Sequence, residues 1–580
     1  MLSVQRSIFV LILFLAAAAP AWAQLTLDQK VHDFQNLASL FAKHYAPLEW
    51  KKRLLGVDAL QITPWLARIR RSQDDLDFLE ICAEYAASLN DAHASFFNGS
   101  SFAADSGLFV DIYDGKVLIE AINRLLLPAR QFPFEVGDEL VAVDGKPVDQ
   151  FIREYSRVMK VGHEQATRRL AADLIVFRPQ LTIPRAHEIP EASDFDIRRR
   201  DGTMETHKIT WDKFGYPLER LGPVPSPNPF KVHSPRMRDE SEGYLKPLME
   251  MQNWSVRRRA PGFQRHREAA AGEGFVLGWG RRAPPFAPPP NLVQRLGRFP
   301  SEFHFSGTYT AGGKRLGYLR IPSFAPPNAT IAVREMLTEI LFFQANTDGL
   351  VVDIMRNDGG GCYLLTAASL LMKERFHVPG QQVRPSLSTI NSFQQSVEVA
   401  REVRAAPWVI TLLENYLSQL VTAYKENRGT TGPLPLCSLS FEEEPARDFN
   451  GGLISYTKPM ILLIDEFSSS AAEIFAAVIQ DNRRGLLVGS RTMGAGGTTS
   501  LSGFDAGVYS ETGVSMTFSL LTRRDPVSVP GFPDAPFIEN IGVHPDVPLE
   551  FMTEENLRNR GLTFVQDFTG VLVDWILRQE

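Results

Sequence analysis

Three adjacent serines lie between a strongly apolar segment and a helical pattern in the last third of the chain. Residues 459–465 read P-M-I-L-L-I-D, residues 466–470 read E-F-S-S-S, and an amphipathic pattern continues to Asp481. A strand that turns sharply into a helix holds a hydroxyl at the positive end of the helix, beside free backbone N–H groups. Acyl-transfer chemistry needs its nucleophile and its oxyanion donors in such a place. The segment therefore indicates a serine nucleophile.

A short polar turn near the other end of the chain contains a histidine. Residues 88–95 read S-L-N-D-A-H-A-S, a short polar turn that contains Asp91 and His93. A serine hydroxyl is a poor nucleophile at neutral pH, and imidazole is the side chain whose pKa best suits removal of the hydroxyl proton. A carboxylate would fix the imidazole tautomer and stabilise the imidazolium. Taken alone, however, a histidine in a turn is by default solvated or structural, so these residues by themselves do not assign His93 a role.

The elements that must position these residues alternate between strands and helices from Lys314 onward. This alternation predicts a mainly parallel sheet covered on both faces, in which sites form at the carboxyl ends of the strands. The turns at 357–361, which read N-D-G-G-G, and at 466–470 both follow strands, so we expect them to converge. The expected strands are 316–321, 349–355, 459–465 and 486–489, and the expected helices are 329–345, 363–373 and 470–481.

Two other kinds of segment precede this region. Residues 24–100 have apolar residues at helical spacing, which predicts a helical N-terminal domain carrying His93. Residues 101–165 change to short apolar runs at 108–112 and 116–119, separated by Asp114-Gly115, a strong hairpin signal. We expect a small β domain here.

A connecting region at 166–222 leads into a stretch of unusual composition at 223–300. Prolines alternate at 223, 225, 227 and 229, arginines fill 257–259, and five more prolines lie between 284 and 290. Proline at this density prevents regular helix or sheet, so we expect a partly disordered insertion with little core of its own. One hypothesis is that it covers the cleft and is removed on activation; an ordinary solvated linker is the alternative.

Length, charge and the first residues bound the class of protein. A chain of 580 residues should hold about two to four domains, and its net charge of -6 gives no reason to expect a nucleic-acid partner. Residues 1–23 combine Arg6, the apolar run 8–19 and A-W-A at 21–23, which is typical of a signal peptide cleaved before Gln24. No later segment approaches roughly 20 uninterrupted apolar residues. We expect an exported protein, periplasmic or extracellular, with no membrane span after cleavage.

The cysteines are few for an exported protein: Cys82, Cys362 and Cys437. Because three is an odd number, at least one is free or pairs between chains. We expect no disulfide framework, and we interpret Cys362 as a small buried residue. No spacing is typical of metal ligands, so neither a metal nor another cofactor is expected.

Five motifs, in order along most of the mature chain, resemble those of the tail-specific and tricorn-type serine peptidases. These are secreted or periplasmic enzymes with a PDZ module and a crotonase-like core, so the resemblance implies an α/β fold. It divides the chain into the helical N-terminal domain, an inserted PDZ-like β domain and a crotonase/ClpP-like catalytic core over residues 301–580. The motifs are L-x-D-x-H at 89–93, V-G-D-E-L-V-A-V-D-G-K-P-V at 136–148, V-D-I-M-R-N-D-G-G at 352–360, the serine segment, and I-E-N-I-G-V-H-P-D-V at 538–547.

The resemblance also implies which residues react. Tail-specific members pair their serine, which maps to Ser470, with a lysine 25 positions later; here 470 + 25 is Ala495, and no lysine follows Lys458. Tricorn-type members instead use a histidine from before the PDZ module and a late glutamate, which map to His93 and Glu539. The implied mechanism is Ser-His-Glu in place of a Ser-Lys dyad, with Glu539 as an orienting group rather than a direct partner.

Backbone groups would complete two sites that the resemblance implies, the oxyanion hole and the peptide-binding loop of the PDZ-like domain. Glycine permits the backbone geometry of an oxyanion loop, and the resemblance assigns the oxyanion hole to the N–H groups of Ala471 and of Gly360 or Gly359. PDZ domains bind peptide C-termini by adding them as a strand to a sheet edge. The loop that would hold such a peptide is Gly107, Leu108 and Phe109.

Other residues compete for these roles. Ser470 and Glu473 also form a capping-box pattern, which alone could explain both, and we assign Glu473 to structure. The rivals are Ser468 and Ser469 for the nucleophile, His544 for the base, and Asp91 and Glu466 for the carboxylate.

We therefore expect an exported serine endopeptidase that cleaves protein or peptide substrates through an acyl-enzyme. A protein of another class, a catalytically inactive PDZ-type peptide-binding scaffold, is the alternative. An esterase or amidase on the same core is a third, less favoured hypothesis. The sequence leaves the oligomeric state open, and a dimer is compatible with it.

Overall fold

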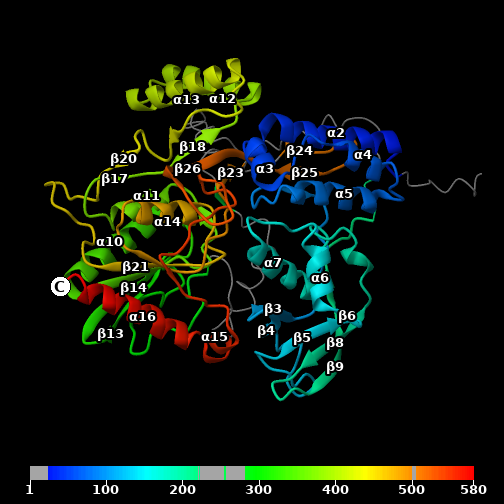
Figure 1. The fold of residues 1–580 in the computed structure, drawn as a ribbon, viewed down its shortest axis with the longest axis horizontal. Coiled ribbons are helices and arrows are strands. Elements are labelled where there is room, and N and C mark those ends of the chain that lie inside the picture. The colour runs from blue at the N-terminus through cyan, green and yellow to red at the C-terminus, as the bar shows by residue number, and fades with distance from the viewer. Residues whose placement is uncertain (1–23, 220, 222–253, 256–280, 500–503) are drawn as a thin grey trace, which may run out of the picture.

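The computed structural model describes residues 24–219, 221, 254–255, 281–499 and 504–580. The predicted signal peptide at 1–23 and most of the predicted insertion lie outside this part. Figure 1 shows the described chain as N-terminal helices in blue, a β domain in cyan, and a larger α/β core in green to red.

A seven-stranded sheet forms the centre of the core. Its order is β12-β13-β14-β15-β21-β22-β28, and the strands from β14 to β28 run parallel. The predicted strands all belong to it, so the expected mainly parallel sheet is confirmed. The strands are β12 (Val293–Leu296), β13 (Phe305–Ala311), β14 (Lys314–Arg320), β15 (Gly349–Asp353), β21 (Met460–Ile464), β22 (Leu486–Gly489) and β28 (Val547–Pro548).

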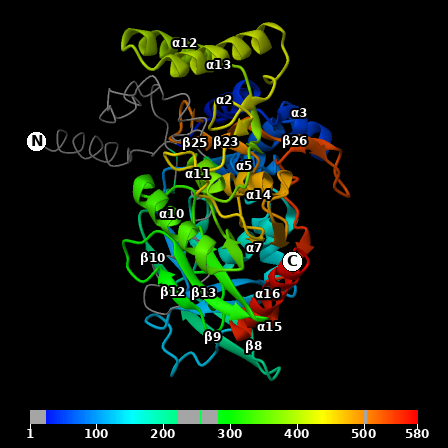
Figure 2. The ribbon, with the colours of Figure 1, turned by 90° about the vertical axis from the view of Figure 1, so that its left-hand side faces the viewer.

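Helices cover both faces of this sheet (Figure 2). Along β15, Leu350 and Val352 join one apolar cluster and Val351 joins the other, because successive strand residues point to opposite faces. Burial on both faces explains why the central strands are almost wholly apolar. One face carries α10 (Ala329–Asn346), α11 (Tyr363–Ser369) and α14 (Ala471–Asp481), and the other carries α15 (Glu554–Asn559) and α16 (Leu562–Leu577).

A second sheet belongs to the same core, with the order β19-β18-β26-β23 and with β27 beside β26. Its strands are β18 (Gly380–Val383), β19 (Leu434–Pro435), β23 (Gly497–Thr499), β26 (Thr517–Val527) and β27 (Ala535–Phe537). Between β18 and β19, a helical hairpin stands out from the molecule (Figures 1 and 2). It consists of α12 (Leu387–Glu402) and α13 (Pro407–Lys425), and nearby β17 (Phe376–His377) pairs with β20 (Glu442–Glu443).

Four helices form the N-terminal body: α2 (Leu27–His44), α3 (Leu48–Leu55), α4 (Thr63–Ile69) and α5 (Asp75–Ser88). After α5 the chain turns through His93 and enters β1 (Ser95–Phe97). This strand pairs antiparallel with β25 (Gly513–Ser515), which in turn pairs with β24 (Phe504–Asp505). The turn that contains His93 is thereby attached to the C-terminal part of the core.

The β domain contains a sheet of order β3-β4-β5-β8-β9, with β6 beside β5. Its β3–β4 hairpin turns at Asp114 and Gly115, which both have positive φ, as the sequence predicts. Strands β8 and β9 fall within the expected connecting region at 166–222, but β8 alternates buried and exposed residues and completes the sheet. The elements are β3 (Leu108–Tyr113), β4 (Lys116–Ile122), β5 (Glu139–Val143), β6 (Lys146–Pro147), α6 (Val148–Tyr155), α7 (Glu164–Val176), β8 (Ala192–Arg198) and β9 (Met204–Thr210). A smaller sheet beside it joins β2 (Ala103–Asp105), β7 (Phe177–Pro179) and β10 (Asp212–Phe214), and a short 3-10 helix, η1, covers Ala186–Glu188.

Residues 281–300, the last part of the predicted insertion, are built into the core. Strand β12 is an edge of the seven-stranded sheet, and the ring of Phe286 is buried against Tyr318, Phe551 and Phe568. Prolines limit regular structure here, but one aromatic ring supplies enough apolar surface to anchor the segment. Residues 281–300 thus pack on the core of the α/β domain, and the expected insertion with little core of its own stays a prediction for the rest of 223–300.

Cys362 and Cys437 form a disulfide, with Cα atoms 5.5 Å apart, and Cys82 is free and buried. The interpretation of Cys362 as an isolated, small buried residue is wrong, because it is half-buried and bonded to a segment 75 residues later. Such pairing requires close Cα atoms, and the spacing of the cysteines along the chain does not reveal that proximity.

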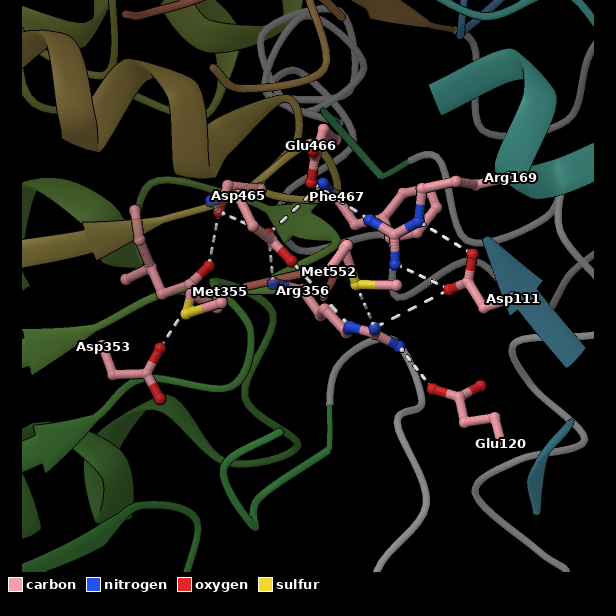
Figure 3. A network of polar contacts seen from close by, with 12 residues as sticks. Asp111, Glu120, Arg169, Asp353, Met355, Arg356, Asp465, Glu466, Phe467 and Met552 are labelled. Carbon is pink, nitrogen blue, oxygen red and sulfur yellow. Dashed lines mark hydrogen bonds and ion pairs between the residues drawn. The ribbon is translucent and has the colours of Figure 1, made fainter. Parts of the chain in front are cut away.

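A network of buried charges joins the β domain to the core (Figure 3). Arg169 on α7 donates two hydrogen bonds to Asp111 on β3, at 2.9 and 2.6 Å, and one to Glu466, at 3.0 Å. Glu466 lies in the serine turn of the core, and the Arg169 guanidinium also lies 4.2 Å from the ring centroid of Phe467. Arg169 therefore connects the β domain directly to the segment that contains the candidate nucleophile.

A second buried arginine, Arg356, lies in the same network (Figure 3). Its guanidinium is 3.6 Å from Glu120, 3.7 Å from Asp111 and 3.8 Å from Asp465. Its backbone N–H donates to Asp465 at 2.7 Å. Because Arg356 directly precedes the glycine turn at 357–361, charged groups of the β domain contact both turns that follow β15 and β21.

Replacement of Arg169 tests this connection. Arg169→Met removes the cation that is hydrogen-bonded to both Asp111 and Glu466, so we expect the free energy of unfolding to fall by about 3–5 kcal/mol. The half-buried neighbour Arg168, whose ion pair with Asp149 lies at the surface, is the matched control, and Arg168→Met should cost about 0.5 kcal/mol or less. Urea unfolding of both variants measures the difference, and equal losses would contradict a tie through Arg169.

Candidate active site

The serine turn forms a sharp corner between β21 and α14. Ser470, the residue before α14, is fully buried and has φ 61° and ψ -114°. A non-glycine residue rarely adopts such a conformation, and strained residues of this kind cluster at active sites. The same strand–corner–helix arrangement exposes the nucleophile of many acyl-transfer enzymes. The geometry thus agrees with the predicted position of the nucleophile.

The two other serines of the cluster have different surroundings. The Ser468 hydroxyl donates to the carbonyl oxygen of Ile354 at 2.8 Å and accepts from the N–H of Asp465, so it is used to hold the turn. Within the described part of the chain, the Ser469 hydroxyl has no hydrogen-bond partner, while its N–H donates to Asn357 at 3.0 Å. That last bond brings the turns 357–361 and 466–470 together, as expected.

His93 meets Ser470 directly. Its Nε2 atom lies 3.0 Å from the Ser470 hydroxyl oxygen, although 377 residues separate them in the sequence. Asp91 supports the His93 turn, since its carboxylate accepts the His93 N–H at 2.7 Å and the Tyr45 hydroxyl at 2.8 Å. The hydroxyl of Ser515 on β25 donates to the His93 carbonyl oxygen. Of the rival carboxylates, Asp91 therefore belongs to the site as a support for the backbone of the turn.

Glu539 is fully buried at the same site, and its carboxylate contacts Lys51 and the N–H of Gly496. Burial raises the pKa of Glu539, the charge of Asp91 raises it further, and the charge of Lys51 lowers it. The Trp50 indole also donates to the Glu539 carbonyl oxygen, at 3.0 Å. Helix α3 thus supplies two partners to the glutamate.

Sequence reasoning missed Lys51. Its position was the available signal: Lys51 lies three residues after Leu48 and four before Leu55 on α3, which places a lysine on the apolar face of the helix. A charge at such a position needs a buried partner. Nothing in the pattern indicated that this partner is Glu539.

Glu473 holds the serine turn against the glycine loop. Its carboxylate accepts the N–H groups of Ser470, Gly494 and Ala495 and the hydroxyl of Thr492, at 2.7 to 2.9 Å. Burial raises its pKa to about 7. These contacts agree with the structural role assigned to Glu473. Two of them bind the N–H groups of Gly494 and Ala495, in the loop where the resemblance to tail-specific peptidases would place a lysine.

The glycine turn offers the predicted oxyanion donors. Gly360 has φ 145°, and a Cβ atom there would lie 2.1 Å from the Phe324 carbonyl carbon, so only glycine fits. The Gly359 N–H already donates to Asn357 Oδ1 at 2.9 Å. In the part of the chain that the structure describes, the Ala471 N–H donates to no other group. Gly360 and Ala471 are thus better candidates than Gly359.

In the predicted peptide-binding loop of the β domain, backbone N–H groups already donate hydrogen bonds to side chains of the adjacent residues. The N–H of Gly107 donates to Asp105 at 2.7 Å, and the N–H of Leu108 donates to Ser106 at 3.2 Å. A peptide carboxylate would have to replace these bonds. Strand β3, which contains Leu108 and Phe109, is an edge of its sheet. Peptide binding by Gly107, Leu108 and Phe109 stays a prediction.

The remaining rival residues lie in other contacts. His544 Nε2 is 3.2 Å from the carbonyl oxygen of Ile541 in a turn, and burial lowers its pKa. Glu466 is bonded to Arg169 and Gln165, and burial raises its pKa to about 7 against the opposing charge of Arg169. Neither contact involves Ser470.

Comparison with known proteins gives consistent matches. Residues 315–549 match Peptidase family S41, and residues 107–220 match a PDZ domain, a span that includes β8 and β9. The chain is 26% identical over 608 residues to a protein of Chlamydia trachomatis serovar D, covering 96% of this chain and 94% of that protein. It is 23% identical over 613 residues to a protein of Chlamydia pneumoniae, covering 96% and 91%. The solved structure of mature CPAF complexed with lactacystin is 22% identical, covers 96% of this chain and 99% of that one, and shares the fold with a TM-score of 0.71.

Two features of the described ranges bear on membranes and metals. The helices there are too short or too polar to cross a membrane. No group of three or more His, Cys, Asp or Glu side chains in those ranges is placed to hold a metal ion.

The backbone strain at Ser470 can be measured. Ser470→Ala removes the hydroxyl but keeps a Cβ atom at φ 61°, whereas Ser470→Gly relieves the strain. Because glycine also has more freedom in the unfolded chain, we expect a net advantage of about 1 kcal/mol for Ser470→Gly over Ser470→Ala in the free energy of unfolding. Urea unfolding of the two variants tests this, and a less stable glycine variant would show that the corner is unstrained.

Proposed function

Residues 315–549 match Peptidase family S41, and on that premise we propose a serine endopeptidase that cleaves protein or peptide substrates through an acyl-enzyme at Ser470. The observation that carries the proposal is the 3.0 Å contact between His93 Nε2 and the Ser470 hydroxyl. A base within hydrogen-bond reach of the hydroxyl is the geometric requirement for proton removal.

The proposed reaction has two halves. His93 takes the Ser470 proton while the hydroxyl oxygen attacks the scissile carbonyl carbon, and the N–H groups of Gly360 and Ala471 stabilise the oxyanion. His93 then gives the proton to the leaving amine, and the acyl-enzyme forms. A water molecule, deprotonated by His93, hydrolyses the ester and restores the Ser470 hydroxyl. Asp91 holds the backbone of the His93 turn, and Glu539, when its carboxyl is ionised, supports the imidazolium that forms in each half.

We propose export as the setting of this activity. The pattern of residues 1–23 is typical of a cleaved signal peptide. The Cys362–Cys437 disulfide supports the same conclusion independently, because disulfides persist in oxidising compartments and are rare in reducing ones.

The hypothesis that the insertion covers the cleft is supported by residues 254–255 of that insertion. Strand β11 (Trp254–Ser255) pairs antiparallel with β16 (Gly359–Gly360), the strand of the glycine turn. A substrate that adds a strand beside the oxyanion donors would use the same edge. We therefore propose that this part of the chain occupies the place of substrate until it is removed.

Removal of the segment can be followed in the purified protein. Peptidase activity should appear together with cleavage between residues 223 and 280, observed by mass spectrometry. The chain with Ser470→Ala, incubated alone, should stay intact if the enzyme cleaves itself. Full activity of an intact chain would contradict the covering role.

Labelling with a fluorophosphonate probe tests the peptidase proposal itself. The folded protein should react at Ser470, Ser470→Ala should abolish labelling, and His93→Gln should slow it by about 10³-fold or more. The matched control is Ser469→Ala. The Ser469 hydroxyl has no hydrogen-bond partner in the described part of the chain, so its loss should leave labelling intact. Failure of correctly folded, processed protein to react would favour the inactive peptide-binding scaffold. Hydrolysis of small esters without cleavage of casein would favour an esterase.

A further inference from the structure

Lys51 is a fully buried lysine with no part in the reaction described above. It lies on α3, in the N-terminal body, and its neighbour Lys52 is exposed. A buried ammonium group is costly unless every donor finds a partner. The partners of Lys51 therefore indicate what its burial achieves.

The ammonium group of Lys51 has three donors, and each has a different acceptor. Nζ donates to the Asn90 carbonyl oxygen at 3.0 Å, to Asn540 Oδ1 at 2.6 Å and to the carboxylate of Glu539. An ammonium group offers three hydrogens, so its capacity is filled. All three acceptors belong to the two turns that carry His93 and Glu539.

The two turns also contact each other around this ammonium group. Asn540 Nδ2 donates to the Asn90 carbonyl oxygen at 2.8 Å and to that of Gly162 at 3.0 Å. Asn90 and Asn540 both have positive φ, 49° and 62°, which asparagine adopts more readily than most residues. One cation thus fixes the start of the His93 turn relative to Glu539.

The charges around Glu539 come from three elements. Lys51 on α3 pairs with it, Asp91 in the His93 turn repels its negative charge, and Glu473 on α14 binds the Ala495 N–H beside the Gly496 N–H that Glu539 accepts. Lys51 is the cation among these groups. Without it, the repulsion between the charges of Asp91 and Glu539 would lack compensation, and protonation of Glu539 would relieve that repulsion.

We propose that Lys51 is a positioning residue for the reaction of Ser470: it holds the His93 turn against Glu539 and favours the ionised form of Glu539. This inference rests on the proposed function, because it assigns Lys51 a role in that reaction. Lys51 contacts neither substrate nor the reacting atoms, and it acts through His93 and Glu539. The lysine of a Ser-Lys dyad acts as the base itself, so the role proposed for Lys51 is a different one.

The test compares steady-state kinetics of the processed enzyme on a peptide substrate between pH 5 and 10. Lys51→Met should lower kcat by about 100-fold at pH 7, because the His93 turn loses its anchor, with KM changed less than about threefold. The acid limb of the kcat profile should move to higher pH. The sign follows from the lost cation: the pKa of Glu539 rises, so its ionised form is populated only at higher pH.

Further variants separate positioning from mere structural support. Lys51→Arg keeps the charge, so its kcat should be at least about tenfold higher than that of Lys51→Met. Lys51→Met combined with Glu539→Gln removes the titrating carboxylate, so the shift of the acid limb should disappear while kcat stays low. Lys52→Met, on the exposed side of the same helix, should behave as wild type.

The outcomes are distinct. Wild-type kcat in Lys51→Met, or a lower melting temperature with an unmoved pH profile, overturns the inference. If Lys51→Met alone does not fold, the double variant is assayed instead, since it buries no unpaired charge. A kcat in that folded double variant equal to that of Glu539→Gln alone overturns the inference equally. Absence of peptidase activity in the wild type would instead refute the proposed function.

Discussion

The hydrogen bond between His93 and Ser470 is the contact on which the rest of the site depends. It joins segments 377 residues apart, and neither segment can form it alone. Strand β1 attaches the His93 turn to β25, and the corner after β21 holds Ser470 at the start of α14. The seven-stranded sheet, the N-terminal helices and the PDZ domain therefore act as one scaffold for a single contact of 3.0 Å.

Buried charges carry much of the docking between these parts. Arg169 and Arg356 connect the PDZ domain to the two turns of the core, and Lys51 connects the N-terminal body to Glu539. Buried ion pairs add little net stability compared with apolar packing, yet an unpaired member is very unfavourable. A displaced domain would leave such charges unpaired, so the arrangement penalises every docking except the correct one. These buried ion pairs therefore fix the relative position of the domains more than they raise the overall stability of the fold.

Much of the fold was predictable from local pattern. The strand, corner and helix around Ser470 follow from apolar runs and a capping pattern, and the parallel sheet follows from their alternation. Lys51 was not predictable, because its partner Glu539 lies 488 residues away. The Cys362–Cys437 bond and the burial of Phe286 could not be predicted for the same reason, because each depends on neighbours that only the tertiary structure supplies. The loop at Gly107 shows a related limit, since its N–H groups bind adjacent side chains where the motif implied a ligand.

The wide separation of His93, Ser470 and Glu539 has a consequence for biosynthesis. Chains emerge from the ribosome N-terminus first, so the histidine is translated long before the serine, and the glutamate comes later still. A nascent chain that stops anywhere before residue 539 lacks part of the site. Under the proposed Ser-His-Glu mechanism, such a partial product cannot act as a peptidase, so the cell that makes the protein is protected from this activity until Glu539 has been added.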